Sequence, residues 1–267
     1  MARLSTPAAL YLLATELLQK RAAISVVVSF LLQASTVAEA GEYYALSGAG
    51  ASNTGLFAYQ GVIALPFGTF DETGPIIRGW AKTFAFDYKT DLIDPNVVAP
   101  PIKGVIINAQ AYALEIESGY QVGSELGRLA LFIGASYRHY SLSPDDPRSP
   151  LAGDHYDLKV AADGAIGSPL GGWGMGFNGS YVTGVEEYWA QFRPRYRWPS
   201  GLEAGADLAA FGGRDYNYGR AGLFLSGLDL SRWGAEATYL GAEAGGQMDI
   251  ELREPEAYGA VHVNFRF

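Results

Sequence analysis

The sequence predicts an all-β fold: a single antiparallel transmembrane β-barrel of about twelve strands, preceded by a signal peptide. Composition is the first observation, because the 267 residues include 34 glycines, 13% aromatic residues and no cysteine. Many strands with tight turns and aromatic girdles need such a composition. The second and third observations are an export signal at the N-terminus and a period-two alternation of apolar and polar residues after it. The net charge of −9 argues against a nucleic-acid partner.

Residues 1–40 have the pattern of a signal peptide. A positively charged region that includes Lys20 precedes an apolar run over 22–32, and 38–40 (Ala-Glu-Ala) form a small-x-small cleavage site. The alternative is an uncleaved anchor, but a run of about 11 residues is short against the roughly 20 that a spanning helix needs. We therefore expect cleavage after 40, with 41–267 forming the barrel.

The rest of the chain divides into segments that alternate with period two between turns rich in glycine, proline and aspartate. An even number of strands keeps both termini on the periplasmic side. The expected strands are centred on 43–51, 56–65, 75–88, 105–120, 127–141, 154–166, 172–183, 186–198, 202–211, 215–227, 233–244 and 256–267.

The alternation is clearest in the segment 127–141. Leu129, Leu131 and Ile133 point to one face, and Arg128 and Arg138 point to the other. A soluble β-sandwich alternates in the same way with its apolar side turned inward, so the pattern alone does not separate the two folds. Segment length favours a membrane barrel, because soluble strands average about 5–6 residues and a tilted spanning strand needs about 9–11.

The last segment also favours the barrel. Val263, Phe265 and Phe267 share one face, and the sequence stops on an aromatic residue. This ending looks like the C-terminal recognition signal of outer-membrane proteins, which makes the barrel-assembly machinery and outer-membrane lipid the expected partners. The longest expected loops, 89–104, 142–153 and 245–255, would all face outward, as in known barrels. The predicted location is the cell outer membrane, with no periplasmic extension.

Charged residues of both signs gather on the polar faces of the expected strands. One interpretation is a polar lumen that steers a solute, and the other is a network of ion pairs that fills a narrow barrel. Both stay open at this point. The candidate residues for a lumen or substrate path are Arg193, Arg195, Arg197, Glu115, Glu117, Asp157, Lys159, Asp207, Arg138 and Trp189.

No enzyme is predicted. Some outer-membrane barrels are hydrolases that use serine, histidine and a carboxylate. Here His139 and His155 are expected to lie close together near the outer rim, with Ser141 and Ser143 nearby. Residues at such a rim are more often interfacial than catalytic, and the chain has no GxSxG, HExxH or glycine-rich phosphate loop. The prediction is therefore no catalytic residue, no metal and no cofactor.

The most distinctive run is 127–147, a strand that ends in Leu-Ser-Pro-Asp-Asp-Pro. Together with 59–66, 188–196, 220–224 and 265–267, it resembles the cellulose biosynthesis protein BcsS family of alphaproteobacteria. The resemblance implies an outer-membrane protein linked to cellulose synthesis and secretion, with glucan and components of the cellulose-synthase complex as partners. It transfers no active residues.

Three functions follow, in order of preference. The first is a cellulose-linked barrel, acting either as an export pore or as an accessory or anchor of the secretion machinery. The second is a general porin-like channel for small solutes. The third is an outer-membrane hydrolase acting on lipid or peptide, for which His139 and His155 would be the residues to test.

Overall fold

A computed structural model describes the chain over six ranges. The described residues are 42–92, 102–168, 171–214, 216–231, 237–250 and 255–266. The predicted signal peptide and Phe267 lie outside them, so cleavage after residue 40 and the role of the terminal aromatic stay predictions. Within these ranges no helix is long and apolar enough to cross a membrane.

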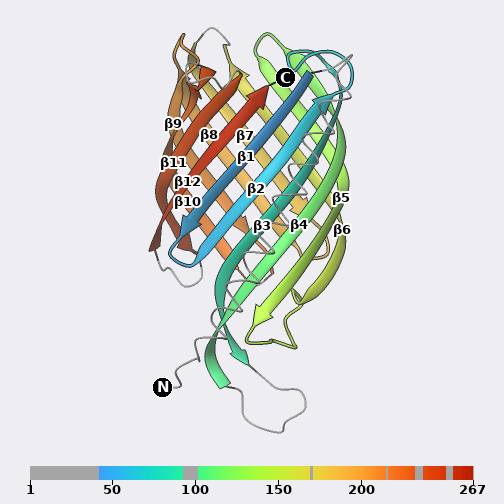
Figure 1. Ribbon diagram of the computed structural model, residues 1–267, viewed down its shortest axis with the longest axis vertical. Coiled ribbons are helices and arrows are strands. Elements are labelled where there is room, and N and C mark those ends of the chain that lie inside the picture. The colour runs from blue at the N-terminus through green and yellow to red at the C-terminus, as the bar shows by residue number, and fades with distance from the viewer. Residues whose placement is uncertain are drawn as a thin grey trace. The chain divides into compact units, whose positions relative to one another are not determined.

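The described residues form twelve strands that run antiparallel to their neighbours around a closed barrel (Figure 1). The strands are β1 (Glu42–Ser52), β2 (Gly55–Leu65), β3 (Gly74–Leu92), β4 (Ile102–Ser124), β5 (Gly127–Ser143), β6 (Gly153–Gly167), β7 (Gly172–Val182), β8 (Glu187–Arg197), β9 (Glu203–Gly212), β10 (Asn217–Asp229), β11 (Thr238–Asp249) and β12 (Pro255–Arg266).

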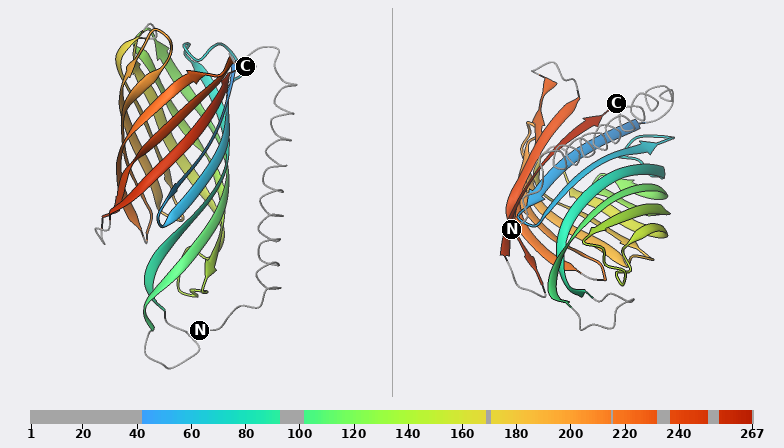
Figure 2. Two further views of the ribbon diagram at one scale, coloured as in Figure 1. Left: turned by 60° about the vertical axis from the view of Figure 1, so that its left-hand side comes forward. Right: turned by 60° about the horizontal axis from the view of Figure 1, so that its bottom comes forward.

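Pairing of the first strand with the last closes the barrel. Ala49 of β1 faces Val261 of β12, and the register is continuous from Tyr44 to Ser52. Figure 2 shows the two strands side by side and all strands tilted against the barrel axis. A closed ladder pairs every strand on both sides, which is how strands can satisfy their backbone polar groups in lipid. The predicted fold class, an antiparallel barrel of about twelve strands, is confirmed.

The alternation turns its apolar side outward. In β4, Leu114 and Ile116 are 50% and 65% exposed, whereas Glu115 and Glu117 between them are 5% and 1% exposed. A soluble sandwich or barrel would bury the leucine and expose the glutamates. The outer surface is therefore apolar and the interior is charged, which is the arrangement of a transmembrane barrel.

Two ends of the barrel can be distinguished by their connections. We call the end with the β1–β2, β3–β4 and β5–β6 connections the outer end, and the opposite end, where β1 begins and β12 ends, the inner end. Strands β3 to β6 extend past the β1–β2 hairpin at the outer end (Figure 1). The β4–β5 turn at the inner end is only two residues long, between Ser124 and Gly127.

The expected boundaries of one strand were wrong by about five residues. The sequence predicted 233–244, whereas β11 runs from Thr238 to Asp249. The glycines at 245 and 246 indicate a turn by their type, but in the structure both pair with β10 and β12. The Tyr258 ring packs over Gly245 and Gly222, which fills the space that their missing side chains leave.

A similar contact joins β2 to β3. Gly61 pairs with Trp80 across the two strands, and the indole ring lies directly over the glycine. Gly48 of β1 is covered by Tyr59 of β2 in the same way. Aromatic rings that cover glycines stabilise a strongly curved sheet and fix its register.

Candidate functional site: a charged lumen

Four neighbouring strands supply a first cluster of charges to the lumen. Its centre is Glu115, whose carboxylate lies 2.5 Å from Lys159 Nζ, 2.8 Å from Lys82 Nζ and 3.1 Å from Arg138 Nη2. Glu117, one pleat away, lies 2.8 Å from Arg78 Nη2 and 3.1 Å from Lys159 Nζ. We call the set on β3 to β6 the first cluster: Arg78, Lys82, Glu115, Glu117, Arg138, Lys159 and Asp163.

The second cluster lies on β8 to β11 and consists of Arg193, Asp207, Arg220 and Glu243. Asp207 lies 2.8 Å from Arg193 Nε and 2.9 Å from Arg220 Nη2. Glu243 lies 3.3 Å from Arg220 Nη2 and also pairs with Arg193. Tyr258 of β12 donates a hydrogen bond of 3.2 Å to Asp207.

Several of these ion pairs cross the interior instead of following the wall. Arg78 of β3 pairs with Asp163 of β6 at 3.1 Å. Arg138 of β5 pairs with Glu187 of β8, and Arg193 of β8 pairs with Glu243 of β11. Since each pair skips two strands, the contacts tie distant parts of the wall together and narrow the lumen.

A cavity of about 780 Å³ lies between the two clusters. Besides the charges, aromatic residues line it, among them Tyr59, Trp80 and Trp189. Trp189 Nε1 donates to Asn178 Oδ1 at 2.5 Å, and the Arg220 guanidinium lies 5.1 Å from the indole. Such a surface can hydrogen-bond hydroxyl groups and stack on the faces of sugar rings.

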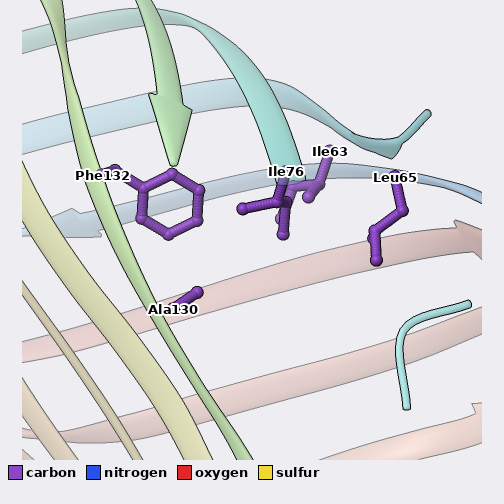
Figure 3. Close-up of a cluster of buried hydrophobic side chains, with 5 residues drawn as sticks. All are labelled: Ile63, Leu65, Ile76, Ala130 and Phe132. Carbon is purple, nitrogen blue, oxygen red and sulfur yellow. The ribbon is translucent and has the colours of Figure 1, made fainter. Parts of the chain in front are cut away.

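The inner end of the interior is apolar. Ile63 and Leu65 of β2, Ile76 of β3, and Ala130 and Phe132 of β5 form one cluster (Figure 3). Phe70 packs against it from the β2–β3 connection. The amide of Gln121 holds this connection by donating to the carbonyls of Phe70 and Glu72 at 2.8 and 2.9 Å.

The outer end of the interior is also apolar. Tyr140, Leu151, Val182 and Val185 form a buried cluster with Ala111, and two of its members come from connections that fold inward. Beside it, the rings of Phe86 and Tyr216 meet 4.9 Å apart, although they come from β3 and from the residues just before β10. Apolar clusters therefore border the lumen at both ends.

An ion pair joins two of the outer connections. Arg214 Nη2 lies 2.7 Å from Glu186 Oε1, which links the β9–β10 connection to the β7–β8 connection. The hydrogen bond and charge of Arg214 hold the pKa of Glu186 below its usual range. The pair fixes these connections beside Val185.

The structure places the predicted lumen residues on the inward face but in different groups. Glu115, Glu117, Arg138 and Lys159 belong to the first cluster, and Arg193 and Asp207 belong to the second. Trp189 lines the cavity. Arg195 and Arg197 are apart from both clusters, paired with Glu203 at 3.3 and 2.5 Å. Asp157 lies against Gly184 of the β7–β8 connection.

The predicted assembly signal is described only in part. Val263 and Phe265 lie on one face of β12, whereas Phe267 is outside the described residues. Neither the signal nor a substrate path is tested by these positions, so both roles stay predictions.

Sequence reasoning missed Arg78, Lys82, Glu187 and Glu243. In β3 the apolar and polar phases are mixed, because Ile76 and Trp80 share the inward face with Arg78 and Lys82. Arg78 and Lys82 could have been found from the alternate spacing Arg78-x-Trp80-x-Lys82, which matches the alternate spacing of Glu115 and Glu117. Glu187 lies next to a turn, at the start of β8. Glu243 lies in β11, the strand whose expected bounds were wrong.

The expectation that His139 and His155 lie together was wrong. They are on adjacent strands, but His139 faces outward and His155 faces inward, where its Nε2 lies 2.9 Å from the Leu151 carbonyl. His139 instead contacts Asp154 and Ser141 on the outer surface. The side-chain period of two separates the histidines, because residue 155 pairs with 138 and not with 139.

A closed antiparallel barrel with an apolar outer surface and a charged, aromatic interior defines a transmembrane β-barrel of the outer-membrane type. The particular family follows from comparison with known proteins. The model of the cellulose biosynthesis protein BcsS family matches residues 44–267, and the chain belongs to this family. This confirms the resemblance found in the sequence. The search of curated proteins gives no match.

Several solved structures are similar to the chain at low identity. The KdgM porin is 8% identical with a TM-score of 0.42, over 84% of this chain and 99% of the other. The transport unit of the Escherichia coli autotransporter AIDA-I is 8% identical with a TM-score of 0.47, over 86% and 91%. The translocator domain of Neisseria meningitidis NalP is 14% identical with a TM-score of 0.44, over 96% and 97%. These likenesses concern the fold alone.

Proposed function

We propose that this chain is an outer-membrane accessory barrel of the cellulose secretion machinery, which anchors or stabilises the machinery at the cell surface. The family links the chain to cellulose biosynthesis. The apolar outer surface supports insertion into lipid, since an exposed belt of leucine, isoleucine and valine is stable only there. The proposed partners are outer-membrane lipid, the barrel-assembly machinery and components of the cellulose-synthase complex.

The observation that carries the accessory role is the set of ion pairs that cross the lumen. Arg138–Glu187 and Arg193–Glu243 each join strands that are not neighbours, and apolar clusters lie at both ends. An open channel for small solutes needs a wide and continuous polar path, and these contacts narrow the space that is left for one. The geometry therefore favours a filled barrel over a general porin.

A glucan conduit is the second candidate, and the cavity favours it. Trp80 and Trp189 offer ring faces, and the charges around them offer hydrogen bonds to hydroxyl groups. A neutral, hydroxyl-rich chain is what such a surface would accept. Under this candidate the crossing ion pairs open when the barrel joins its partners.

Deletion and complementation separate the two candidates. Removing this protein with the synthase intact is expected to lower extracellular cellulose, and the unchanged protein is expected to restore it. The accessory role predicts that Trp189→Ala restores cellulose as well as the unchanged protein does. The conduit predicts that it does not. Normal cellulose after the deletion itself would contradict both.

A further inference from the structure

Three polar side chains form a connected row on the outer surface of the barrel, away from the lumen. His139 Nδ1 lies 2.9 Å from Asp154 Oδ1, and His139 Nε2 lies 3.4 Å from Ser141 Oγ. His139 and Ser141 are two residues apart on β5, so they share the outward face, and Asp154 pairs with His139 from β6. Neither the lumen nor the cellulose link makes use of them.

We propose that Ser141, His139 and Asp154 form a serine-hydrolase site that cleaves carboxylic esters of membrane lipid. The order of contacts is the one that such chemistry requires: a nucleophile, a base beside it, and a carboxylate on the far nitrogen of the base. The distance of 3.4 Å from base to nucleophile is at the long end for a hydrogen bond, which is common before substrate binds.

The base is held in one orientation. Asp154 Oδ1 also accepts a hydrogen bond of 2.8 Å from Tyr137, whose hydroxyl lies 3.1 Å from that of Tyr112. The Tyr112 ring stacks on the imidazole with centroids 5.2 Å apart. Because the Nδ1–H of His139 donates its hydrogen bond to Asp154, the lone pair on Nε2 is directed to Ser141. The ring is thus fixed in the tautomer that can take up the serine proton.

The first half of the reaction forms an acyl-enzyme. Ser141 Oγ attacks the ester carbonyl carbon while its proton passes to His139 Nε2, and the carbonyl oxygen becomes an oxyanion. When the oxyanion collapses, the bond from carbon to the alcohol oxygen breaks, and His139 returns the proton to the leaving alcohol. In the second half, His139 takes a proton from water, the hydroxide attacks the acyl carbon, and the acid leaves as Ser141 regains its proton.

Gln110 is placed to stabilise the oxyanion. It lies directly across from Ser141 in the β4–β5 pairing, and its side chain is exposed on the same face. Among the described residues, its amide makes one side-chain contact, at 3.3 Å with the neighbouring Asn108. Residues opposite each other in a ladder have Cβ atoms about 5 Å apart, so this amide reaches an oxygen bound next to Ser141.

The surroundings of the site select the substrate. One pleat below it on the outer surface lie Leu114, Tyr137 and Tyr156, and below those lie Ile116, Ala135 and Leu158. Leu129 is the first exposed apolar residue of β5 at the inner end. Ser141 follows it on the same strand, and at about 3.4 Å per residue and a tilt of about 45° it is roughly 29 Å above Leu129 along the membrane normal. Since the apolar band is about 25 Å tall, the serine lies at its outer boundary, where the ester bonds of lipids are found.

Covalent labelling of the detergent-solubilised mature barrel (Gly41 to Phe267) tests the nucleophile. A fluorophosphonate probe is expected to modify Ser141, located by peptide mass spectrometry, and the label is expected to disappear in Ser141→Ala and His139→Asn. Ser143→Ala is the matched control, because Ser143 shares the strand and the outward face but faces Asn108 across the ladder, with no histidine contact among the described residues. No label on the unchanged protein, or equal labelling of Ser141→Ala, would overturn the proposal.

Hydrolysis assays test the other roles and the substrate. Loss of Ser141 is expected to lower the rate of release of fatty acid from phospholipid in mixed micelles by at least about 10³-fold, and Gln110→Ala by about 10²–10³-fold. Hydrolysis of p-nitrophenyl acetate with none of the phospholipid would overturn the assignment of a lipid ester. Equal phospholipid hydrolysis by Ser141→Ala would overturn the site itself.

Asp154 acts through His139 and is a positioning residue, so its test separates kcat from KM. In Asp154→Asn the imidazole loses the carboxylate beside Nδ1, and kcat is expected to fall on the order of 10²–10⁴-fold while KM for phospholipid stays unchanged. A small loss of kcat, or a loss confined to KM, would show that Asp154 has only a structural role, and would contradict this part of the proposal.

Discussion

Three cations share the carboxylate of Glu115. Lys82, Lys159 and Arg138 all lie within 3.1 Å of its oxygens, and its side chain has no exposed surface. Charges in such a place are costly to transfer from water, and their mutual attraction offsets that cost only while all partners are present. This residue therefore matters more for the integrity of the lumen than any exposed ion pair of the barrel.

Glu115→Gln is expected to destabilise the folded barrel by about 3–5 kcal/mol, because it removes the charge that three cations share and leaves the buried Lys159 with Glu117 and the buried Arg138 with Glu187 as their remaining carboxylates. Glu125→Gln is the control, since Glu125 is exposed in the β4–β5 turn. Reversible unfolding by guanidinium in lipid or detergent measures both. Equal free energies of unfolding for the two variants would contradict the role given to Glu115.

At the scale of elements, glycines and aromatic rings set how neighbouring strands fit. Trp80 lies over Gly61, so a side chain at that position would meet the indole ring. Gly219 of β10 differs, because nothing lies within 4 Å of the position that a Cβ would take there. The two glycines look alike in sequence and differ only in what covers them.

Gly61→Val is expected to destabilise the barrel by about 1–3 kcal/mol, as overpacking does elsewhere. Gly219→Val is expected to be neutral or slightly stabilising, since valine suits a strand better than glycine does. Thermal unfolding in the same detergent compares them. If both variants unfolded at the same midpoint temperature as the unchanged protein, the packing of Trp80 on Gly61 would not contribute to stability.

The same glycines explain which elements could be predicted. Strands with a clean alternation, such as β5 and β8, were predicted to within two residues of their observed bounds, because one apolar face is enough to define them. The bounds of β11 were wrong because Gly245 and Gly246 indicate a turn unless the partner strand is known to supply Tyr258. Which charges meet across the lumen depends on pairings between distant strands, and no local pattern contains that information.

At the scale of the whole molecule, the direction of the alternation decides the environment. Leu131 and Ile133 of β5 are 59% and 54% exposed, whereas Phe132 between them is buried. The sequence predicts that these faces alternate, but only the closed barrel shows which of them is outside. An outward apolar belt of this kind is stable in lipid and would aggregate in water.

A charge in the middle of the belt is therefore expected to be costly. Ile116 of β4 pairs with Ala135 of β5, about halfway down the belt from Ser141. Ile116→Arg should destabilise the barrel in lipid bilayers by about 2–4 kcal/mol, and Ser143→Arg at the outer end by about 0–1 kcal/mol. The difference is measured by unfolding titrations in liposomes. Equal effects at the two positions would contradict the placement of Ile116 in the apolar band.

Crossing ion pairs that fill the interior should leave the barrel closed to ions. Single-channel conductance of the refolded mature barrel in planar bilayers, with and without short cello-oligosaccharides, tests this directly. Little or no conductance is expected for the unchanged protein, and a clear rise is expected when Arg138→Ala, Glu187→Ala, Arg193→Ala and Glu243→Ala are combined. Steady conductance of the unchanged protein that the oligosaccharides block would contradict the filled lumen and establish a glucan conduit instead.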